Sequence, residues 1–480
     1  MENQSQHTAP NKGGSLKSRL GAVTRSRWIR FAAAALVTIG FAWWIGNGWI
    51  LLLIVLFTDI YLTRFIRWGF WRTSENRAFR KTMEWVDAIL YALVAVYIIN
   101  TFFFQNYKIP SSSLEKSLLV GDYLFVSKLS FGPRMPNTPL SFPLAQHTLP
   151  VVNTKSYIEK PQWPYHRLRG TGTVQLNDIV VFNFPAGDTV ALKVQNPDYY
   201  TLCYREGRET ILRNKDIFGD IVFRPVDRRE NYVKRCVGMP GDTFRIIDNQ
   251  IYLNGVKQKN PENMQLNYYV MTNGTRLGEL NFRELDVSAD DREYVNNPDL
   301  LLFLGFDPDQ IRTGLPVYRL PLTQKALEKI KSYPFVVKVV GEPGEFGGET
   351  YPLGYSHGWN RANYGPVWIP RRGATLKLTP DNLPVYERVI RNYEGNRLEV
   401  KNNKIYINGT ETDEYTFKMD YYMMLGDNRD NSADSRFWGF VPEDHIVGKP
   451  LVVWLSIDKD RAWFDGRIRF NRLFKSVGRD

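Results

Sequence analysis

Hydrophobic residues are arranged differently before and after Phe104: long apolar runs come first, and short alternating stretches follow. The long runs are Phe31–Gly46, Trp49–Thr63 and Trp85–Phe104. A helix needs about 20 mostly apolar residues to cross a bilayer. Only the third run has that length, and Asn47-Gly48 alone separates the first two. The pattern predicts a short membrane hairpin followed by a full membrane-spanning helix.

Basic residues flank these runs. The chain has a formal net charge of +12, and Arg and Lys cluster before the first run and between the second and third. Because cytoplasmic loops are enriched in Lys and Arg, residues 1–29 and 65–84 are expected in the cytoplasm, with the third helix leading outward. The alternative to the hairpin is one long tilted or re-entrant segment. It would change only the side of the membrane on which the extreme N-terminus lies. This placement of charge favours a membrane over nucleic acid.

After Gln105, short stretches rich in β-branched and aromatic residues alternate with Gly, Pro and Asn-Gly turns, as in a β-rich domain. Two similar segments, Asp248–Gly255 and Asn402–Gly409, predict one kind of hairpin used twice. Leu322–Lys331 is the clearest helical stretch. The expected strands are Tyr123–Val126, Asp178–Phe184, Ile221–Phe223, Tyr232–Val237, Thr243–Ile247, Gln250–Leu253, Phe335–Val340, Arg397–Val400, Lys404–Ile407 and Leu451–Leu455.

Cysteine and histidine are scarce. The chain has two cysteines, Cys203 and Cys236, so a disulfide framework is excluded, while a single bond between them stays an alternative. The five histidines are scattered and show no metal-ligand spacing. No metal site is therefore predicted, and a hydrolase built on this chain would need a base other than histidine.

Three serines, Ser111 to Ser113, follow Pro110 soon after the third apolar run. Proline disfavours the helical conformation for Ile109, so the chain is expected to arrive extended and then turn at the serines. Serine-rich turns are usually structural. A functional interpretation of these serines therefore needs other segments that could supply a base and the groups that orient it.

The first such segment is Tyr232–Asp242, "YVKRCVGMPGD". Strand alternation places Lys234 on the same face as Tyr232 and Cys236, and burial there would lower the pKa of its ammonium. A neutral lysine can remove a proton from a hydroxyl. The structural alternative is a surface lysine at a strand end. Lys338, in "FVVKVVGEPGE", has similar surroundings and is a second candidate.

The second segment is Gly426–Arg436, "GDNRDNSADSR", which carries more charged and polar residues than a solubilising loop needs. An Asp-x-Arg pair in it could brace the loop, and a serine hydroxyl could orient a base. A plain charged hairpin is the alternative.

Four blocks in this order, after an outward-leading membrane helix, resemble bacterial signal peptidase I, a membrane-bound Ser/Lys peptidase. They are "IPSSSLEKSLLVGD", "NDIVVFNFP", "YVKRCVGMPGD" and "GDNRDNSADSRFWGFVP". The resemblance extends from about Tyr107 to Lys449, with long insertions.

The resemblance assigns roles to nine residues. Ser113 is implied as the nucleophile and Lys234 as the general base. Ser111 is implied as an oxyanion donor beside the Ser113 amide, and Ser432 as the residue that orients Lys234. The remaining residues are a structural ion pair and the linings of pockets for small substrate side chains at positions −1 and −3: Asp434 with Arg436, and Tyr107, Ile109 and Val233.

The chain departs from the family pattern at two places. The family's Ser-Met-x-Pro-Thr-Leu reads Ser-Leu-Glu-Lys-Ser-Leu from Ser113 to Leu118, so Leu114 replaces methionine and Lys116 replaces proline. Ser111 and Ser112 therefore stay alternatives to Ser113 as the nucleophile. Asn177 stands where glycine usually precedes "DIVVF", and a left-handed conformation is expected there.

The fold class implied is mostly β: N-terminal transmembrane helices followed by an exported β-rich Ser/Lys peptidase domain with a large inserted β subdomain. The aromatic-rich segment His357–Pro370 is expected to be a loop of that insertion that docks on lipid or substrate. The expected divisions are residues 1–29 (cytoplasmic), 30–64 (membrane hairpin), 65–84 (cytoplasmic loop), 85–104 (membrane helix), 105–244 and 420–480 (catalytic β domain) and 245–419 (inserted subdomain).

The function implied is removal of N-terminal signal peptides from exported preproteins after small-x-small (Ala-x-Ala) sites, through an acyl-enzyme intermediate and without a cofactor. Expected partners are such preproteins and the lipid bilayer, not nucleic acid. The expected location is the bacterial cytoplasmic (inner) membrane, multi-pass, with the catalytic domain on the outer (periplasmic) side. A Ser/Lys peptidase with another task and a non-enzymatic envelope β-protein are the competing classes.

Overall fold

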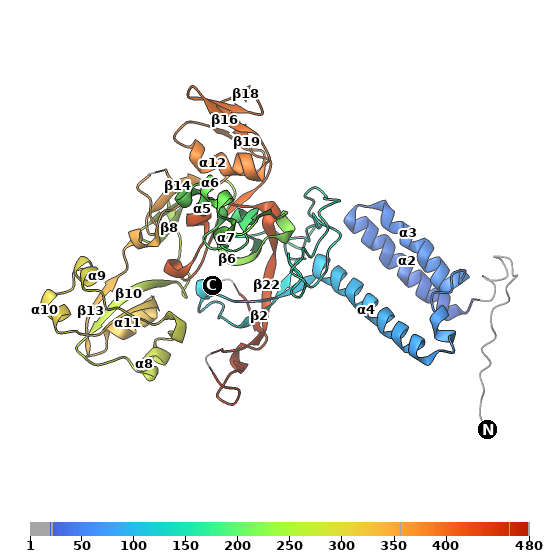
Figure 1. Ribbon diagram of the computed structural model, residues 1–480, viewed down its shortest axis with the longest axis horizontal. Helices are drawn as coiled ribbons and strands as arrows, with labels where there is room; N and C mark the ends of the chain where they lie inside the picture. Colours follow the sequence, from blue (N-terminus) through green and yellow to red (C-terminus); the bar gives the residue numbers. More distant parts are fainter. Residues whose placement is uncertain (1–19, 21–22, 356, 460, 479–480) are drawn as a thin grey trace. The chain divides into compact units, whose positions relative to one another are not determined.

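The computed structural model describes residues 20, 23–355, 357–459 and 461–478. The chain divides into two compact units, Met1–Tyr97 and Ile98–Asp480. Most of the basic segment predicted for residues 1–29 lies outside the described residues. The first unit is helical and the second contains the sheets (Figure 1).

Two helical segments lie side by side in the first unit (Figure 1). Helix α2, Arg25–Ile45, ends at Gly46, which has the left-handed conformation (φ 71°) that stops a helix. The second segment is the 3₁₀ helix η1, Gly48–Leu51, then α3, Leu52–Thr58, and the π-helical turn η2, Asp59–Thr63. The chain therefore reverses between the two apolar runs, and they do not form one long helix.

Helix α4, Arg77–Phe102, contains nearly all of the third apolar run and begins eight residues before it, because the basic residues that precede the run are also helical. A short 3₁₀ helix, η3, Phe70–Thr73, comes before it. Among the described residues, α2 and α4 are long and apolar enough to cross a membrane, and the apolar helix Gly48–Thr63 is shorter. The predicted full-length helix is confirmed.

The main sheet of the second unit has eight strands, and its order is β1-β2-β22-β3-β6-β20-β21 with β23 also paired to β22. Strands from the beginning and the end of the unit therefore lie side by side (Figure 1). Their bounds are β1 Phe104–Lys108, β2 Asp122–Ser127, β3 Ile179–Asn183, β6 Asn231–Gly238, β20 Tyr421–Leu425, β21 Val441–Pro442, β22 Ile446–Ser456 and β23 Lys475–Ser476.

Smaller sheets surround the main one. A four-stranded sheet, named here the β10 sheet, has the order β11-β12-β10-β13 and is formed by Glu293–Tyr294, Val317–Thr323, Gln265–Thr272 and Val336–Gly341. A second four-stranded sheet has the order β14-β7-β8-β9, formed by Tyr364–Trp368, Thr243–Ile247, Gln250–Leu253 and Val256–Lys257. The others are β16-β17-β18 (Leu398–Lys401, Lys404–Ile407, Thr410–Glu411), β15-β19 (Thr375–Lys377, Glu414–Thr416) and β4-β5 (Thr189–Ala191, Ile221–Phe223).

The predicted repeated hairpin is confirmed. Strands β7, β8 and β9 and strands β16, β17 and β18 form two antiparallel meanders. Asn254 and Asn408 both have positive φ, near 50°, in the Asn-Gly turns of these meanders. The expected strands are confirmed to within one or two residues, except that Leu451–Leu455 is part of the longer β22.

Short helices were missed by the sequence pattern, because four to eight residues are too few to show a helical period. The predicted helix is confirmed as α11, Gln324–Lys331. The domain is therefore mostly β, with short helices between its strands. The additional helices are α5 Tyr199–Glu206, α6 Arg208–Arg213, α7 Lys215–Phe218, α8 Glu279–Glu284, α9 Pro298–Phe303, α10 Pro308–Arg312, α12 Leu383–Arg388 and α13 Ser435–Trp438.

Two further sequence expectations change. His357–Pro370 is not simply a loop, because its second half contains β14, whose Tyr364 and Val367 are buried in a large apolar core. The two cysteines are free thiols, with Cys203 partly exposed on α5 and Cys236 buried in β6. The disulfide left as an alternative is absent from these described residues.

Candidate active site

The serine cluster forms a tight turn directly after β1. Ser111 is extended (φ −130°, ψ 157°) and precedes the 3₁₀ helix η4, Ser112–Leu114. Ile109 donates its N–H to the Asp122 carbonyl of β2 (2.9 Å), which fixes the chain just before the turn. Leu114, in the position of the family's methionine, is buried in an apolar cluster. Ser113 is thereby held in place with only 9% of its surface exposed.

Lys234 lies on β6, between β3 and β20 of the main sheet. It is paired in register with Val180, and its residue surface is 4% exposed. Lys234 Nζ is 2.6 Å from Ser113 Oγ, within hydrogen-bonding distance. Asn177, just before β3, has the predicted left-handed conformation (φ 67°) and donates its N–H to the Cys236 carbonyl of β6. The structure therefore brings together the two residues that the sequence singled out as nucleophile and base.

Burial lowers the pKa of Lys234 to about 8, although the carboxylates of Asp434 and Asp427 favour its charged form. An unperturbed lysine has a pKa near 10.4, so this side chain is much more often neutral at ordinary pH. A neutral amine at this distance can accept the Ser113 proton. The geometry and the charge state both suit a serine activated by lysine.

We expect hydrolytic activity to rise with pH through the acidic limb. Below the pKa of about 8 the ammonium form of Lys234 predominates and cannot accept a proton. kcat/KM should therefore fall about tenfold for each pH unit below that value. The measurement is a kcat/KM profile from about pH 5.5 to about pH 9.5, with return to pH 8 as a check that the enzyme survives. A profile that is flat through this range would contradict the role of Lys234.

The loop between β20 and α13 closes over the serine turn. Asn428 donates its backbone N–H to the Ser113 carbonyl (3.1 Å) and its side-chain amide to the Ser112 carbonyl (3.3 Å). Ser432 is buried, and its Oγ has no hydrogen-bond partner among the described residues. Gly426 lies against both Ser432 and the Ser113 carbonyl, so closely that a Cβ at this position would overlap them. The loop therefore packs directly on the Ser113 turn, with no side chain at position 426 between them.

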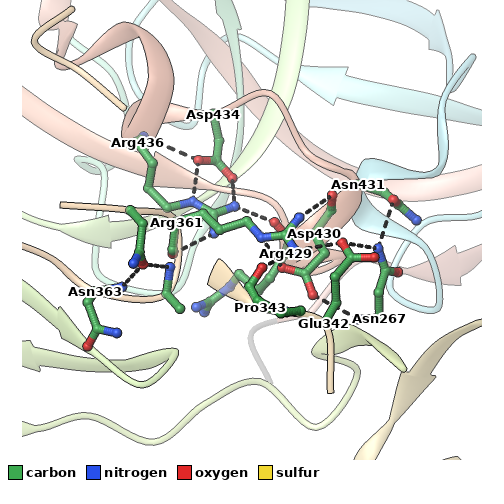
Figure 2. Close-up of polar contacts among 12 residues, drawn as sticks. Asn267, Glu342, Pro343, Arg361, Asn363, Arg429, Asp430, Asn431, Asp434 and Arg436 are labelled. Carbon is green, nitrogen blue, oxygen red and sulfur yellow. Dashed lines mark hydrogen bonds and ion pairs between the residues drawn. The ribbon is translucent and has the colours of Figure 1, made fainter. Parts of the chain in front are cut away.

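Buried ion pairs hold this loop. Arg436 donates two hydrogen bonds to the Asp434 carboxylate (2.8 Å each), and both side chains are 0% exposed (Figure 2). Asp434 also accepts the Gly426 N–H (3.2 Å). A second buried pair joins Arg235, beside Lys234, to Asp427 (2.7 Å). The ion pair predicted from the Asp-x-Arg motif is present, and it connects the two ends of the loop.

The remaining predicted site residues also lie near the serine turn. Tyr107, Ile109 and Val233 belong to one apolar cluster with Leu114, and Ile109 is buried in it. Ser111 is exposed at the start of the turn. Lys338 lies instead on β13, where its ammonium contacts the Gly305 carbonyl and the Phe306 ring. The contacts of this second lysine candidate are therefore with the loop beside the β10 sheet.

The replacement of the family's proline by Lys116 goes together with a different backbone conformation at this position. Lys116, which replaces proline, has a φ of 73°, a value that proline cannot adopt. Its ammonium is 3.3 Å from the Asp286 carboxylate, just after α8. The preceding Glu115 is buried, and burial raises the pKa of its carboxyl to about 7. The residue that replaces the family's proline therefore makes an ion pair that proline could not make.

Sequence reasoning missed several residues that contact the loop. Arg235 lies in the segment "YVKRCVGMPGD", directly after Lys234. Its position beside a lysine that was predicted to be buried could have marked it. Gln265, Asn267, Glu342 and Arg361 lie far from the motifs, and nothing in their local sequence marks them. Their contacts exist only because the β10 sheet and the segment before β14 fold against residues 427–431.

Comparison with known proteins defines the class. A family model described as "Signal peptidase, peptidase S26" matches residues 82–297 and 413–455, more than half of the chain. The protein is therefore a peptidase. The signal peptidases I of Haemophilus influenzae, Buchnera aphidicola (subspecies Acyrthosiphon pisum) and Pseudomonas aeruginosa are 25%, 24% and 21% identical to it over 402, 385 and 408 residues. These alignments cover 82%, 79% and 82% of this chain and 75%, 77% and 78% of the relatives. The chain belongs to the signal peptidase I family.

Proposed function

We propose that the protein is a membrane-anchored serine endopeptidase that removes N-terminal signal peptides from exported preproteins after small-x-small (Ala-x-Ala) sites. The observation that carries the proposal is the 2.6 Å separation of Ser113 Oγ and Lys234 Nζ in a buried setting. Burial lowers the pKa of Lys234 to about 8, so a neutral amine is available to act as the base.

The proposed reaction begins when neutral Lys234 takes the Ser113 proton as Oγ attacks the carbonyl carbon of the scissile bond. The Ser113 N–H and the Ser111 hydroxyl then donate hydrogen bonds to the oxyanion of the tetrahedral intermediate. The Lys234 ammonium protonates the leaving amine, and an ester between substrate and Ser113 remains. Lys234 next takes a proton from water as the water attacks the ester carbonyl. Lys234 then gives this proton to Ser113 Oγ as the ester bond breaks, which releases the signal peptide and restores Ser113 and the neutral amine.

Supporting residues have separate roles in this scheme. Ser432 orients the Lys234 amine, and the Asp434–Arg436 pair holds the loop that carries Ser432. An extended substrate adds beside the site as a β-strand, with main-chain hydrogen bonds for affinity. Tyr107, Ile109 and Val233 line shallow pockets that accept small side chains at positions −1 and −3.

We also propose how the chain is arranged across the membrane. The hairpin over residues 30–64 and the helix over 85–104 span the bacterial inner membrane, with the basic residues before and between them in the cytoplasm. The catalytic β domain, residues 105–244 and 420–480, lies on the periplasmic side and is interrupted by a subdomain, residues 245–419. This arrangement holds the site near the membrane from which its substrates emerge. The bilayer and preproteins are the proposed partners; nucleic acid is not, and no cofactor takes part in the scheme.

A precursor assay tests this function. Purified protein in lipid is incubated with a membrane-anchored precursor that has an Ala-x-Ala site, and the new N-terminus is identified by mass spectrometry. Cleavage directly after the second alanine is expected, and a matched precursor with Phe at position −1 should remain intact. Ser113→Ala protein gives the background. Cleavage of both precursors, or cleavage elsewhere, would contradict the proposal.

A further inference from the structure

Strand β10 of the β10 sheet reaches the loop that carries Ser432. Gln265 donates its N–H to the Asp427 carbonyl (2.9 Å) and forms an isolated parallel bridge with Asn428. Two residues later, Asn267 donates its N–H to the Asp430 carboxylate (2.8 Å). The same loop is bonded to the Ser113 turn on its other side through Asn428. The loop is therefore held between the β10 sheet and the nucleophile.

Arg361 links that sheet to both ends of the segment around Ser432 (Figure 2). Its guanidinium pairs with the Asp430 carboxylate (3.2 Å) and with Glu342, which directly follows β13 (2.5 Å). Its main-chain carbonyl accepts a hydrogen bond from Arg436 (3.0 Å), the partner of Asp434. Asp430 and Asp434 lie two residues before and two residues after Ser432. One residue thus contacts the supports on both sides of this serine.

These side chains are almost fully buried and charged, so their geometry is restricted. The Glu342, Arg361 and Asp430 side chains are 2%, 4% and 4% exposed. Burial alone would raise the pKa of Glu342, but hydrogen bonds from Arg319 and Arg361 lower it to about 2. Asn267 adds a side-chain hydrogen bond to Glu342 (3.2 Å). A buried charge of this kind is tolerated only when its partners are held in place.

We propose that Arg361 and Glu342 are positioning residues for the Ser113–Lys234 pair. They fix Asp430 and Arg436, and through them the loop from Gly426 to Arg436 that packs on the Ser113 turn. The role of the β10 sheet in the reaction is then to set the position of Ser432 and of the Ser113 carbonyl. This inference rests on the proposed peptidase function. Both residues lie between the two segments that the family model matches. The inference therefore gives a role to a part of the chain that the model does not match.

The test compares Arg361→Gln, Arg361→Lys and Glu342→Gln with the wild-type protein in lipid. Arg292→Gln is the matched control: Arg292 is a partly buried arginine directly before β11, and its described side-chain contacts go to the Glu279 carboxylate, the Val287 carbonyl and the Phe282 ring. For each protein, kcat and KM for the Ala-x-Ala precursor are measured against pH. Thermal unfolding gives the folded fraction to which kcat is normalised.

We expect Arg361→Gln to lower the normalised kcat by about 10- to 100-fold with KM changed less, because a small displacement of reacting groups has effects of that size. The acidic limb of the profile should move toward higher pH as water reaches Lys234. Glu342→Gln should have the same effects to a smaller degree, and Arg361→Lys should restore part of the rate. Arg292→Gln should keep the normalised kcat within about twofold of wild type.

A purely structural role would lower the unfolding temperature and leave the normalised kcat and the acidic limb unchanged. That result for Arg361→Gln would overturn the inference. If Arg361→Gln does not fold, the same result for Arg361→Lys and Glu342→Gln would overturn it. A loss of rate in Arg292→Gln equal to that in Arg361→Gln would also overturn it. Absence of any Ser113-dependent cleavage by the wild-type protein would instead reject the peptidase function, and the positioning role with it.

Discussion

Replacement of Ser113 by Ala, or of Lys234 by Met, is expected to lower kcat/KM for an Ala-x-Ala precursor by at least about 10³-fold. Ser113→Ala removes the attacking oxygen. Lys234→Met keeps an apolar chain of similar length in the buried position but removes the amine that lies 2.6 Å from Ser113 Oγ. Because both residues act in one step of the proposed reaction, the double variant should be about as inactive as either single variant.

Lys234→Arg separates the role of a base from the role of a positive charge. A guanidinium stays protonated at all accessible pH values, so it cannot accept the Ser113 proton. We therefore expect Lys234→Arg to be as inactive as Lys234→Met, with no recovery at high pH. If charge were the requirement, the arginine variant would keep substantial activity, and the assignment of Lys234 as the base would be wrong.

Lys338→Met is the matched control for Lys234→Met, since Lys338 also lies on a strand and also follows a valine. It should cut at the wild-type rate. Thermal unfolding of each variant shows whether a loss of rate reflects a loss of fold. Activity that survives in Ser113→Ala but not in Ser111→Ala or Ser112→Ala would move the nucleophile to another serine of the cluster. If Lys338→Met lost activity and Lys234→Met kept full activity, the role of the base would belong to Lys338.

Gly426→Ala is the second substitution with a large expected effect. A single methyl at this position would overlap Ser432 Oγ and lie 2.5 Å from the Ser113 carbonyl oxygen. The loop or the serine turn must then shift, and a displacement of about 1 Å can cost about 10²-fold in rate. Overpacking of this kind also destabilises a core by about 1–3 kcal/mol. The measurements are kcat/KM and the unfolding midpoint in denaturant.

The control for this substitution is Gly172→Ala. Gly172 is exposed, and an added Cβ would meet only the Ser130 carbonyl oxygen at 3.5 Å, an ordinary contact. Its activity and unfolding midpoint should stay close to wild type. A fully active Gly426→Ala variant would show that the loop has room to move away from Ser113. The close packing of the loop would then not be a requirement for catalysis.

Local sequence was sufficient to predict the short-range features of the site. Pro110 and three serines indicated a turn, alternation around Lys234 indicated a buried strand lysine, and the Asp-x-Arg motif indicated an ion pair, because each depends on residues close together in the chain. Asn177 could be assigned a left-handed conformation because few residues adopt it readily. The family resemblance was what combined these segments into one site.

Long-range contacts could not be predicted in the same way. Arg361 contacts Asp430 and Glu342 only because β13, β14 and the loop before α13 meet in space, and no period or motif in the sequence encodes that meeting. The segment around it was interpreted as an aromatic loop, since its aromatic residues were visible and their burial was not. Short helices such as α5 were likewise invisible to periodicity.

The strand order of the main sheet has a consequence for synthesis of the protein. Residues 122–127 of β2 pair with residues 449–456 of β22, and the Ser113 turn is bonded to Asn428. A growing chain therefore carries the Ser113 turn long before it carries the loop that packs on this turn, and the β22 side of β2 stays unpaired until residues 449–456 have left the ribosome. The unfinished polypeptide therefore lacks the Ser113–Asn428 bond and exposes one edge of β2 until β22 pairs with it.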